Sequence, residues 1–99
     1  NSSWHYLQYL ETCEFCGEGE AEKMLRDGET EIGGKVAVCP SGGFSSFGEA
    51  IGAQALWQVY EASKQLRGEC ASRQVTNARV AMAQTYGLMG NSGTTILKT

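Results

Sequence analysis

The feature that most limits the possible folds is a long run of small and apolar residues near the middle of the chain. From about Glu49 to Arg67 the pattern predicts a helix, and its first half, AIGAQALW, is apolar on nearly every side. The second half is amphipathic, with Leu56, Tyr60 and Leu66 on one face. A helix that is apolar all round must be covered on all sides, so we expect it to lie inside a core.

The other predicted elements are a helix, a helical turn, a short strand and a hairpin. They span residues 4–15, 20–26 and 35–38 and, as two antiparallel strands, residues 80–86 and 94–99. Gly68 is placed to cap the long helix. These elements are too few to enclose an apolar helix. We therefore expect the core to be completed by a missing half, a second copy or another subunit.

Length and charge exclude several classes of protein. The 99 residues fit one small domain, residues 1–99, and a net charge of -3 without a basic run argues against nucleic acid as a partner. No apolar run approaches the roughly 18 residues of a membrane span. No leader segment, with charged residues followed by an apolar run, is apparent. We expect a soluble, cytoplasmic protein.

Four cysteines raise the question of a metal or redox site. Cys13 and Cys16 have the two-residue gap of zinc ligands, but the chain has a single histidine, and Cys39 and Cys70 are far apart in the sequence. On a helix, Cys13 and Cys16 would share one face and behave as small apolar residues. We expect packing roles and no metal.

A glycine-rich stretch precedes the long helix and leaves two interpretations open. Gly42 and Gly43 suit either a tight turn or the close approach of a ligand. Ser46 and Glu49 fit a capping box, in which Glu49 reaches back to the start of the helix. Alternatively, Glu49 is a general base whose pKa is raised by apolar surroundings.

Three segments carry a resemblance to a known family. GGKVAVCPSGGFSSFGEAIGAQALWQVYEASKQLRGE, RQVTNARVAMAQ and GLMGNSGTTIL resemble, in order and spacing, the C-terminal half of the thiolase superfamily, most closely its sterol-carrier-protein-x and lipid-transfer branch. The resemblance extends over residues 6–97. It implies an α/β fold, the C-terminal half of the five-layer αβαβα thiolase fold, with a buried helix packed on a small mixed sheet. It also implies dimers, and coenzyme A thioesters as substrates without a further cofactor.

The chain departs from that family at its catalytic positions. Where such thiolases have Gly-His-Pro, this chain has Gly48, Glu49 and Ala50, so the histidine is absent. The family's nucleophilic cysteine belongs to the N-terminal half, which lies outside this sequence. Near the loop where many thiolases place a second cysteine, this chain has Gln84, Thr85 and Tyr86.

The resemblance nevertheless implies candidate site residues. His5 stands at the asparagine of the family's Asn-Glu motif and, beside Glu49, would form an acid–base couple; the alternative is a helix-surface or core residue. Tyr86 either donates a proton or packs at a strand end. Gly87 and Gly90, in GLMGNSG, either present N–H groups to an oxyanion or form a hairpin turn. With Gly42 and Gly43 they are the expected substrate-binding glycines.

The expected function is that of a component of a larger acyl-CoA enzyme. The chain would form a wall of the thioester pocket of an acyl-CoA C-acyltransferase or of a carbon–carbon lyase. The lyase is included because some relatives in the lipid-transfer branch cleave carbon–carbon bonds as aldolases do, instead of by thiolysis. Its expected partners are an N-terminal thiolase half or a second copy, and a small OB-fold protein is a further partner implied by that branch. The alternatives are a catalytically silent interaction domain and a fragment of a longer protein.

Overall fold

The structure is a computed structural model that describes residues 2–99. The chain divides into two compact units, unit 1 (Asn1–Phe47) and unit 2 (Gly48–Thr99), and each is described by itself. The chain is of mixed α/β type, as predicted, with a small sheet in unit 2.

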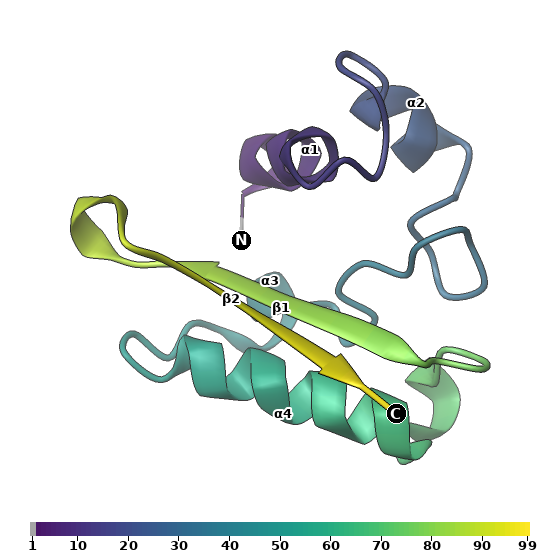
Figure 1. Ribbon diagram of the computed structural model, residues 1–99, viewed down its shortest axis with the longest axis vertical. Coiled ribbons are helices and arrows are strands. Elements are labelled where there is room, and N and C mark those ends of the chain that lie inside the picture. Colours follow the sequence, from purple (N-terminus) through teal and green to yellow (C-terminus); the bar gives the residue numbers. More distant parts are fainter. Residues whose placement is uncertain (1) are drawn as a thin grey trace. The chain divides into compact units, whose positions relative to one another are not determined.

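Unit 1 is helical and has a small apolar core. Its helices are α1 (Ser3–Thr12), α2 (Ala21–Arg26) and the four-residue α3 (Phe44–Phe47) (Figure 1). The buried centre is formed by Leu10, Ala21 and Met24. The side chains packed around this centre are Tyr6, Leu7, Phe15, Cys16, Val36 and Val38.

The predicted helix of residues 4–15 is confirmed as α1, but it ends three residues early. Glu14 has a φ of 59°, a left-handed conformation that stops the helix. Glu11 then fixes the following loop, because its Oε1 atom accepts hydrogen bonds from the backbone N–H groups of Gly19 and Ala21 at 3.0 and 3.3 Å. A side chain of α1 therefore fixes the start of α2.

The predicted strand of residues 35–38 is wrong. Val36 and Val38 donate backbone hydrogen bonds to the carbonyl oxygens of Glu29 and Thr30 at 3.0 and 2.9 Å. These two bonds do not form the hydrogen-bond ladder of a β-sheet. The segment instead packs its valines on the core of unit 1. Its apolar alternation reflects contact with helices, which periodicity alone does not distinguish from a strand.

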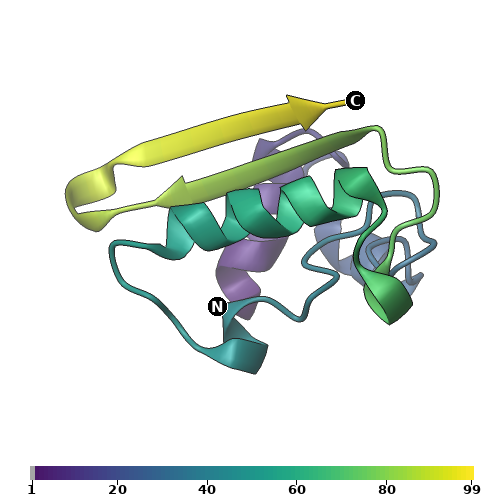
Figure 2. The ribbon, with the colours of Figure 1, turned by 90° about the horizontal axis from the view of Figure 1, so that it is seen from below.

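Unit 2 consists of one long helix on a hairpin. The helix is α4 (Gln54–Arg67), and the strands β1 (Val80–Tyr86) and β2 (Ser92–Lys98) pair antiparallel, as predicted, from Val80 opposite Lys98 to Tyr86 opposite Ser92. Two 3₁₀ turns, Ala71–Arg73 and Leu88–Gly90, complete the unit. Figure 2 shows α4 lying along the hairpin, and its contacts are mainly with β1.

The long helix begins five positions later than predicted, so the expected capping box is wrong. The N-cap of α4 is Ala53, which makes no side-chain capping bond, and Glu49 lies in the segment before it. Gly48 and Gly52 adopt φ values of 89° and 83°, which interrupt any helix that starts at Glu49. The C-terminal end is as predicted, since Gly68 caps it in the left-handed conformation with a φ of 74°.

One face of α4 packs on the sheet and the opposite face is exposed. Ala62 and Gln65 are buried on the packed face. On the opposite face Leu56 is 72% exposed and Tyr60 is 59% exposed. Within unit 2, the hairpin thus covers one face of the helix and leaves the opposite face open. The expectation that other protein covers this face stays a prediction.

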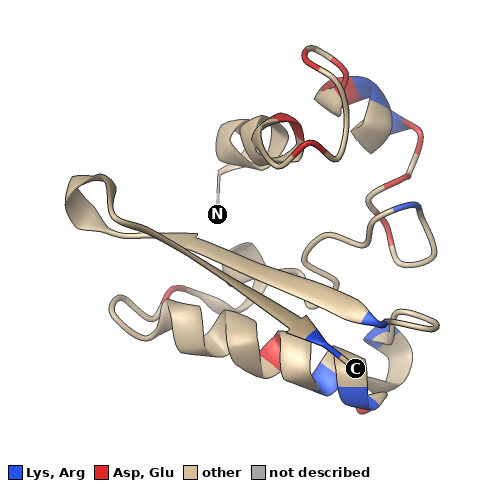
Figure 3. Cartoon of the chain, viewed as in Figure 1, with Lys and Arg blue, Asp and Glu red and all other residues tan. Residues whose placement is uncertain are grey.

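The two units differ in charge. Unit 1 has eight Asp and Glu against three Lys and Arg, whereas unit 2 has three against five. The basic residues of unit 2 lie near the end of α4 and near the adjoining strand ends (Figure 3). Among the described residues, every helix is too short or too polar to cross a bilayer.

Candidate functional site

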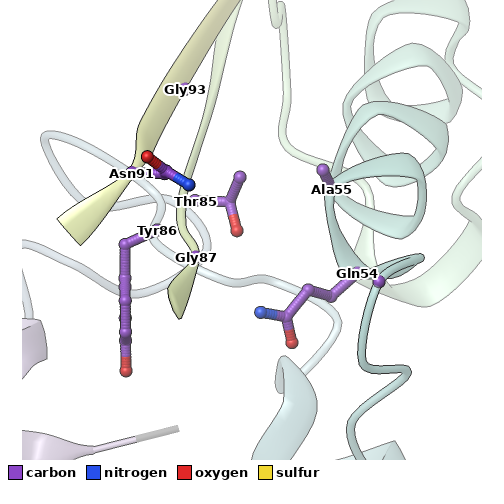
Figure 4. A pocket seen from close by; sticks show the side chains of 8 residues that line it. Gln54, Ala55, Thr85, Tyr86, Gly87, Asn91 and Gly93 are labelled. Carbon is purple, nitrogen blue, oxygen red and sulfur yellow. The ribbon is translucent and has the colours of Figure 1, made fainter. Parts of the chain in front are cut away.

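A pocket of about 270 Å³ lies in unit 2 between the start of α4 and the end of β1 (Figure 4). Its lining residues come from the turn before α4, the first turn of α4, the end of β1, the loop between the strands and the start of β2. They are Gly52, Gln54, Ala55, Thr85, Tyr86, Gly87, Asn91 and Gly93.

Strand alternation decides which β1 side chains enter the pocket. Ala83 is buried against α4, so Thr85 shares its face and Tyr86 lies on the other. Figure 4 shows the Thr85 side chain between strand and helix, while the Tyr86 ring extends away from that space. Gly93 is the partner of Thr85 across the hairpin, and the absence of a side chain there leaves room beside Thr85.

The first residue of α4 places an amide in this pocket. The Gln54 side chain extends from the helix toward the strand (Figure 4), and its Oε1 atom is buried with no hydrogen-bond partner among residues 2–99. Gln58, one turn further along, also has a buried Oε1 without such a partner, but it does not line the pocket. A buried amide oxygen without a donor is uncommon in a folded protein.

The loop between the strands is a hydrogen-bonded turn. The Gly87 N–H donates to the carbonyl oxygen of Asn91 at 2.7 Å, and Gly90 adopts a φ of 79° outside the pocket lining. The Gly87 N–H is therefore engaged within the turn, which supports the hairpin-turn interpretation. The substrate-binding roles of Gly87 and Gly90 stay predictions.

Glu49 lies in unit 2 but outside the pocket. It is exposed and stands five positions before α4, and it does not belong to the lining residues. The apolar walls that would make it a general base are not seen around it in the described chain. Its catalytic role therefore stays a prediction.

The remaining candidates belong to unit 1. His5 is half-buried on α1, where its ring lies 5.1 Å from that of Trp4 and 6.4 Å from that of Tyr9 between centroids. Gly42 and Gly43 form a tight turn, because the Gly42 N–H donates to the Cys39 carbonyl oxygen at 2.8 Å. The structure thus brings Tyr86 and Gly87 to one pocket, while His5, Gly42 and Gly43 lie in the other unit.

The cysteines are the residues that raised the question of a metal or redox site. No group of three or more potential metal ligands lies together among residues 2–99, and the four cysteines are free thiols. Cys70 is buried, and this burial raises its thiol pKa, which the nearby Glu61 carboxylate raises further. A thiol held in its neutral form is a poor nucleophile, which favours the predicted packing role of Cys70.

Sequence reasoning missed three polar residues of the pocket, namely Gln54, Thr85 and Asn91. Gln54 carried a usable signal, because it is the one polar side chain within the apolar run AIGAQALW. Thr85 carried a signal through the family resemblance, because it stands near the loop where many thiolases place a second cysteine. Asn91 carried none, since its position depends on the register of the hairpin.

The sequence matches a known family over its whole described length. A family model described as thiolase C-terminal domain-like matches residues 2–99. The chain belongs to this thiolase family. The resemblance deduced from the three sequence segments is thereby confirmed.

Relatives of this thiolase C-terminal domain include enzymes and a carrier protein. This chain is 43% identical over 82 residues, 82% of its length, to benzoylsuccinyl-CoA thiolase subunit BbsB of Thauera aromatica. It is 39% identical over 96 residues, 97% of the chain, to sterol carrier protein 2 of Homo sapiens. It is 39% identical over 85 residues, 86% of the chain, to the acetyl-CoA acetyltransferase of Methanothermobacter thermautotrophicus.

The thiolase domain corresponds to a minor part of each relative. The matched region spans 21%, 18% and 22% of the lengths of these three proteins. Most of each relative therefore lies outside the region that this domain matches.

Proposed function

We propose that this thiolase C-terminal domain works as part of a larger acyl-CoA C-acyltransferase or carbon–carbon lyase. In this proposal it forms one wall of the thioester pocket, and the reaction makes or breaks a carbon–carbon bond next to the thioester carbonyl. The substrate is a coenzyme A thioester, and no further cofactor is needed. The nucleophile comes from protein outside these 99 residues.

The observation that supports this proposal is the pocket between α4 and β1 in a chain of the thiolase family. It includes Tyr86 and Gly87, two of the residues that the family resemblance implied. Its volume of about 270 Å³ is smaller than the roughly 300–1,000 Å³ of ordinary ligand pockets. It therefore holds one end of a thioester, and other protein covers the rest.

The lining residues suit stabilisation of charge rather than nucleophilic attack. None of the eight is a cysteine or a histidine. The Thr85 hydroxyl and the Asn91 amide are hydrogen-bond donors, and donors placed at a thioester oxygen stabilise the negative charge that develops there. Proton donation by Tyr86 and base catalysis by Glu49 remain separate proposals within this scheme.

The exposed face of α4 supports a larger assembly. Leu56 and Tyr60 are 72% and 59% exposed, and Ile51, just before the helix, is 88% exposed. The matched relatives are about four to five times as long as this chain. We assign the cover of this face to an N-terminal thiolase half or to a second copy of the chain. A small OB-fold protein is a further partner in this proposal.

The test is to produce the chain together with an N-terminal thiolase half and to follow thioester cleavage with acetoacetyl-CoA. If Glu49 is the base, Glu49→Gln lowers the rate by about 10²-fold or more. Glu18→Gln, at another exposed acidic residue, is the matched control and leaves the rate unchanged. Activity that survives Glu49→Gln would remove Glu49 from the mechanism but keep the proposed function.

The alternative is a catalytically silent domain that stabilises an assembly. The position of Glu49 outside the pocket and the lack of cysteine and histidine in the lining favour it. In that case the assembled wild-type protein neither binds acetyl-CoA nor cleaves thioesters, although the two parts still associate.

A further inference from the structure

The sheet of unit 2 has two strands, so each strand has one edge without a partner strand among residues 2–99. A two-stranded sheet alone is only marginally stable in water, and an open edge presents a row of unpaired backbone N–H and C=O groups. Such an edge accepts an extended strand of other protein through main-chain hydrogen bonds. The two edges of this sheet are not equivalent, however.

The register of the hairpin determines which backbone groups of β1 point to its open edge. The Thr99 N–H donates to the Arg79 carbonyl oxygen at 3.1 Å, and the Gly87 N–H donates to that of Asn91 at 2.7 Å. In an antiparallel ladder such pairs alternate with pairs whose N–H and C=O groups point away from each other. The odd-numbered residues of β1 therefore bond to β2, and the even-numbered ones direct their backbone groups outward. The outward set includes Val80, Met82 and Gln84.

The position of α4 distinguishes the two edges. The helix contacts mainly β1, and Figure 2 shows it displaced to the side of β1 that faces away from β2. Every residue of β2 except Leu97 is exposed. A strand added to the open edge of β1 would therefore lie over α4, whereas a strand added to β2 would have no helix beneath it.

The sequences of the two strands differ in the same sense. Natural edge strands carry charged residues, especially lysine, or proline, which prevent further pairing, and glycine weakens a strand. β1 has the sequence VAMAQTY, without charge, proline or glycine. β2 contains Gly93 and ends with Lys98. β2 thus has features of an edge strand, and β1 has those of an inner strand.

We infer that β1 is an inner strand of a larger sheet and that an extended segment of protein outside these 99 residues pairs with its open edge. This segment bonds to the backbone N–H and C=O groups of Val80, Met82 and Gln84. The matched region is only 18–22% of the length of three relatives, so most of each relative is chain from which such a strand can come. The inference rests on the proposed function for the source of the strand, which is the N-terminal thiolase half.

Amide hydrogen exchange, read residue by residue by NMR, compares the chain alone with the chain assembled with its N-terminal thiolase half. We expect the Met82 and Gln84 amides to exchange about tenfold or more slowly in the assembly, because they gain partners there. The Ala83 amide bonds to β2 and is protected in both samples. Thr94 and Ile96 direct their amides to the open edge of β2 and are the matched control, whose exchange stays unchanged.

A pair of proline variants tests the same edge through the affinity of the two parts. Met82→Pro removes an outward N–H group and leaves the hydrogen bonds between β1 and β2 intact. Ile96→Pro, directly opposite in the register, does the same at the edge of β2 and is the control. We expect Met82→Pro to weaken the association about fivefold or more in calorimetry and Ile96→Pro to leave it unchanged. Thermal melting verifies that each variant is folded.

The results that would overturn the inference are distinguishable from failure of the proposed function. If the two parts associate but the Met82 and Gln84 amides gain no protection, no strand pairs with β1 and the proposed function stands. The same holds if the Thr94 and Ile96 amides gain the protection instead, or if Ile96→Pro weakens the association as much as Met82→Pro. If the wild-type parts do not associate, the proposed function fails together with the inference.

Discussion

At the residue scale, the glycine-rich stretch has a backbone geometry that separates its two interpretations. Gly42 has a φ of 85°, and a Cβ atom there would lie 2.2 Å from Ser46 Oγ. We expect Gly42→Ala to lower the free energy of unfolding by about 1–3 kcal/mol, because it adds a clash to a strained conformation. Gly43→Ala, where the new Cβ would meet only ordinary contacts, should cost less. Urea unfolding measures both.

A Gly42→Ala variant as stable as the wild type would contradict the tight-turn interpretation. If that variant also bound acetyl-CoA more weakly, the close approach of a ligand would explain the glycine instead.

One ion pair gives unit 2 a pH-dependent stability. Arg73 hydrogen-bonds both carboxylate oxygens of Glu61 at 3.0 and 3.1 Å, which lowers the Glu61 pKa from its ordinary value. The ion pair therefore stabilises the fold fully at pH values above the ordinary pKa of glutamate. This stabilisation is lost as the pH falls through the lowered pKa of Glu61. We expect Glu61→Gln to cost about 1–2 kcal/mol at pH 7, and the difference from wild type to shrink below about pH 4.

Urea titrations at several pH values test this expectation. Glu22→Gln is the control, because Glu22 pairs with Arg26 on the exposed surface of α2, where such a pair contributes about 0–1 kcal/mol. A Glu61→Gln penalty that stays constant from pH 7 to pH 3 would show that the carboxylate charge is not what stabilises the loop.

At the element scale, a buried amide helps to fix α4 to the chain that follows it. Gln65 is 6% exposed and bonds the backbone of Arg73 and Val75, so it ties the helix to the segment before β1. We expect Gln65→Leu to lower the free energy of unfolding by about 2–4 kcal/mol, because two backbone groups lose their partners. Gln58→Leu, whose oxygen has no partner in the described chain, should be neutral or stabilising.

Chemical denaturation of the two variants separates these outcomes. Equal penalties for Gln65→Leu and Gln58→Leu would mean that side-chain size, and not hydrogen bonding, sets the stability of the contact between α4 and its loop.

At the scale of the whole molecule, the exposed apolar face of α4 determines how the chain behaves without its cover. Leu56 is 72% exposed on that face. We expect Leu56→Asp to prevent association with an N-terminal thiolase half, because a charge would then be buried in an apolar interface. Light scattering after size-exclusion chromatography measures the association.

The matched control is Leu25→Asp, at a residue that is 45% exposed on α2 in unit 1. It should leave the association intact. Association that survives Leu56→Asp would place the interface elsewhere on the molecule.

The sequence by itself determined the local elements whose signals lie within a few residues. The α1 helix and the β1–β2 hairpin follow from apolar periodicity, and the end of α4 follows from Gly68, because each depends on nearby side chains or on backbone freedom. The apolar character of the long helix led to the expectation that other protein covers it, and this expectation stays a prediction. The family followed from ordered motifs.

Only the tertiary structure decided which residues share a site. The turn through Gly48 and Gly52 moved the start of α4 away from Glu49, and the core of unit 1 turned an expected strand into an irregular segment around Val36. The hairpin register placed Thr85 inward and Tyr86 outward. Such juxtapositions depend on packing between segments distant in sequence, which no local pattern encodes.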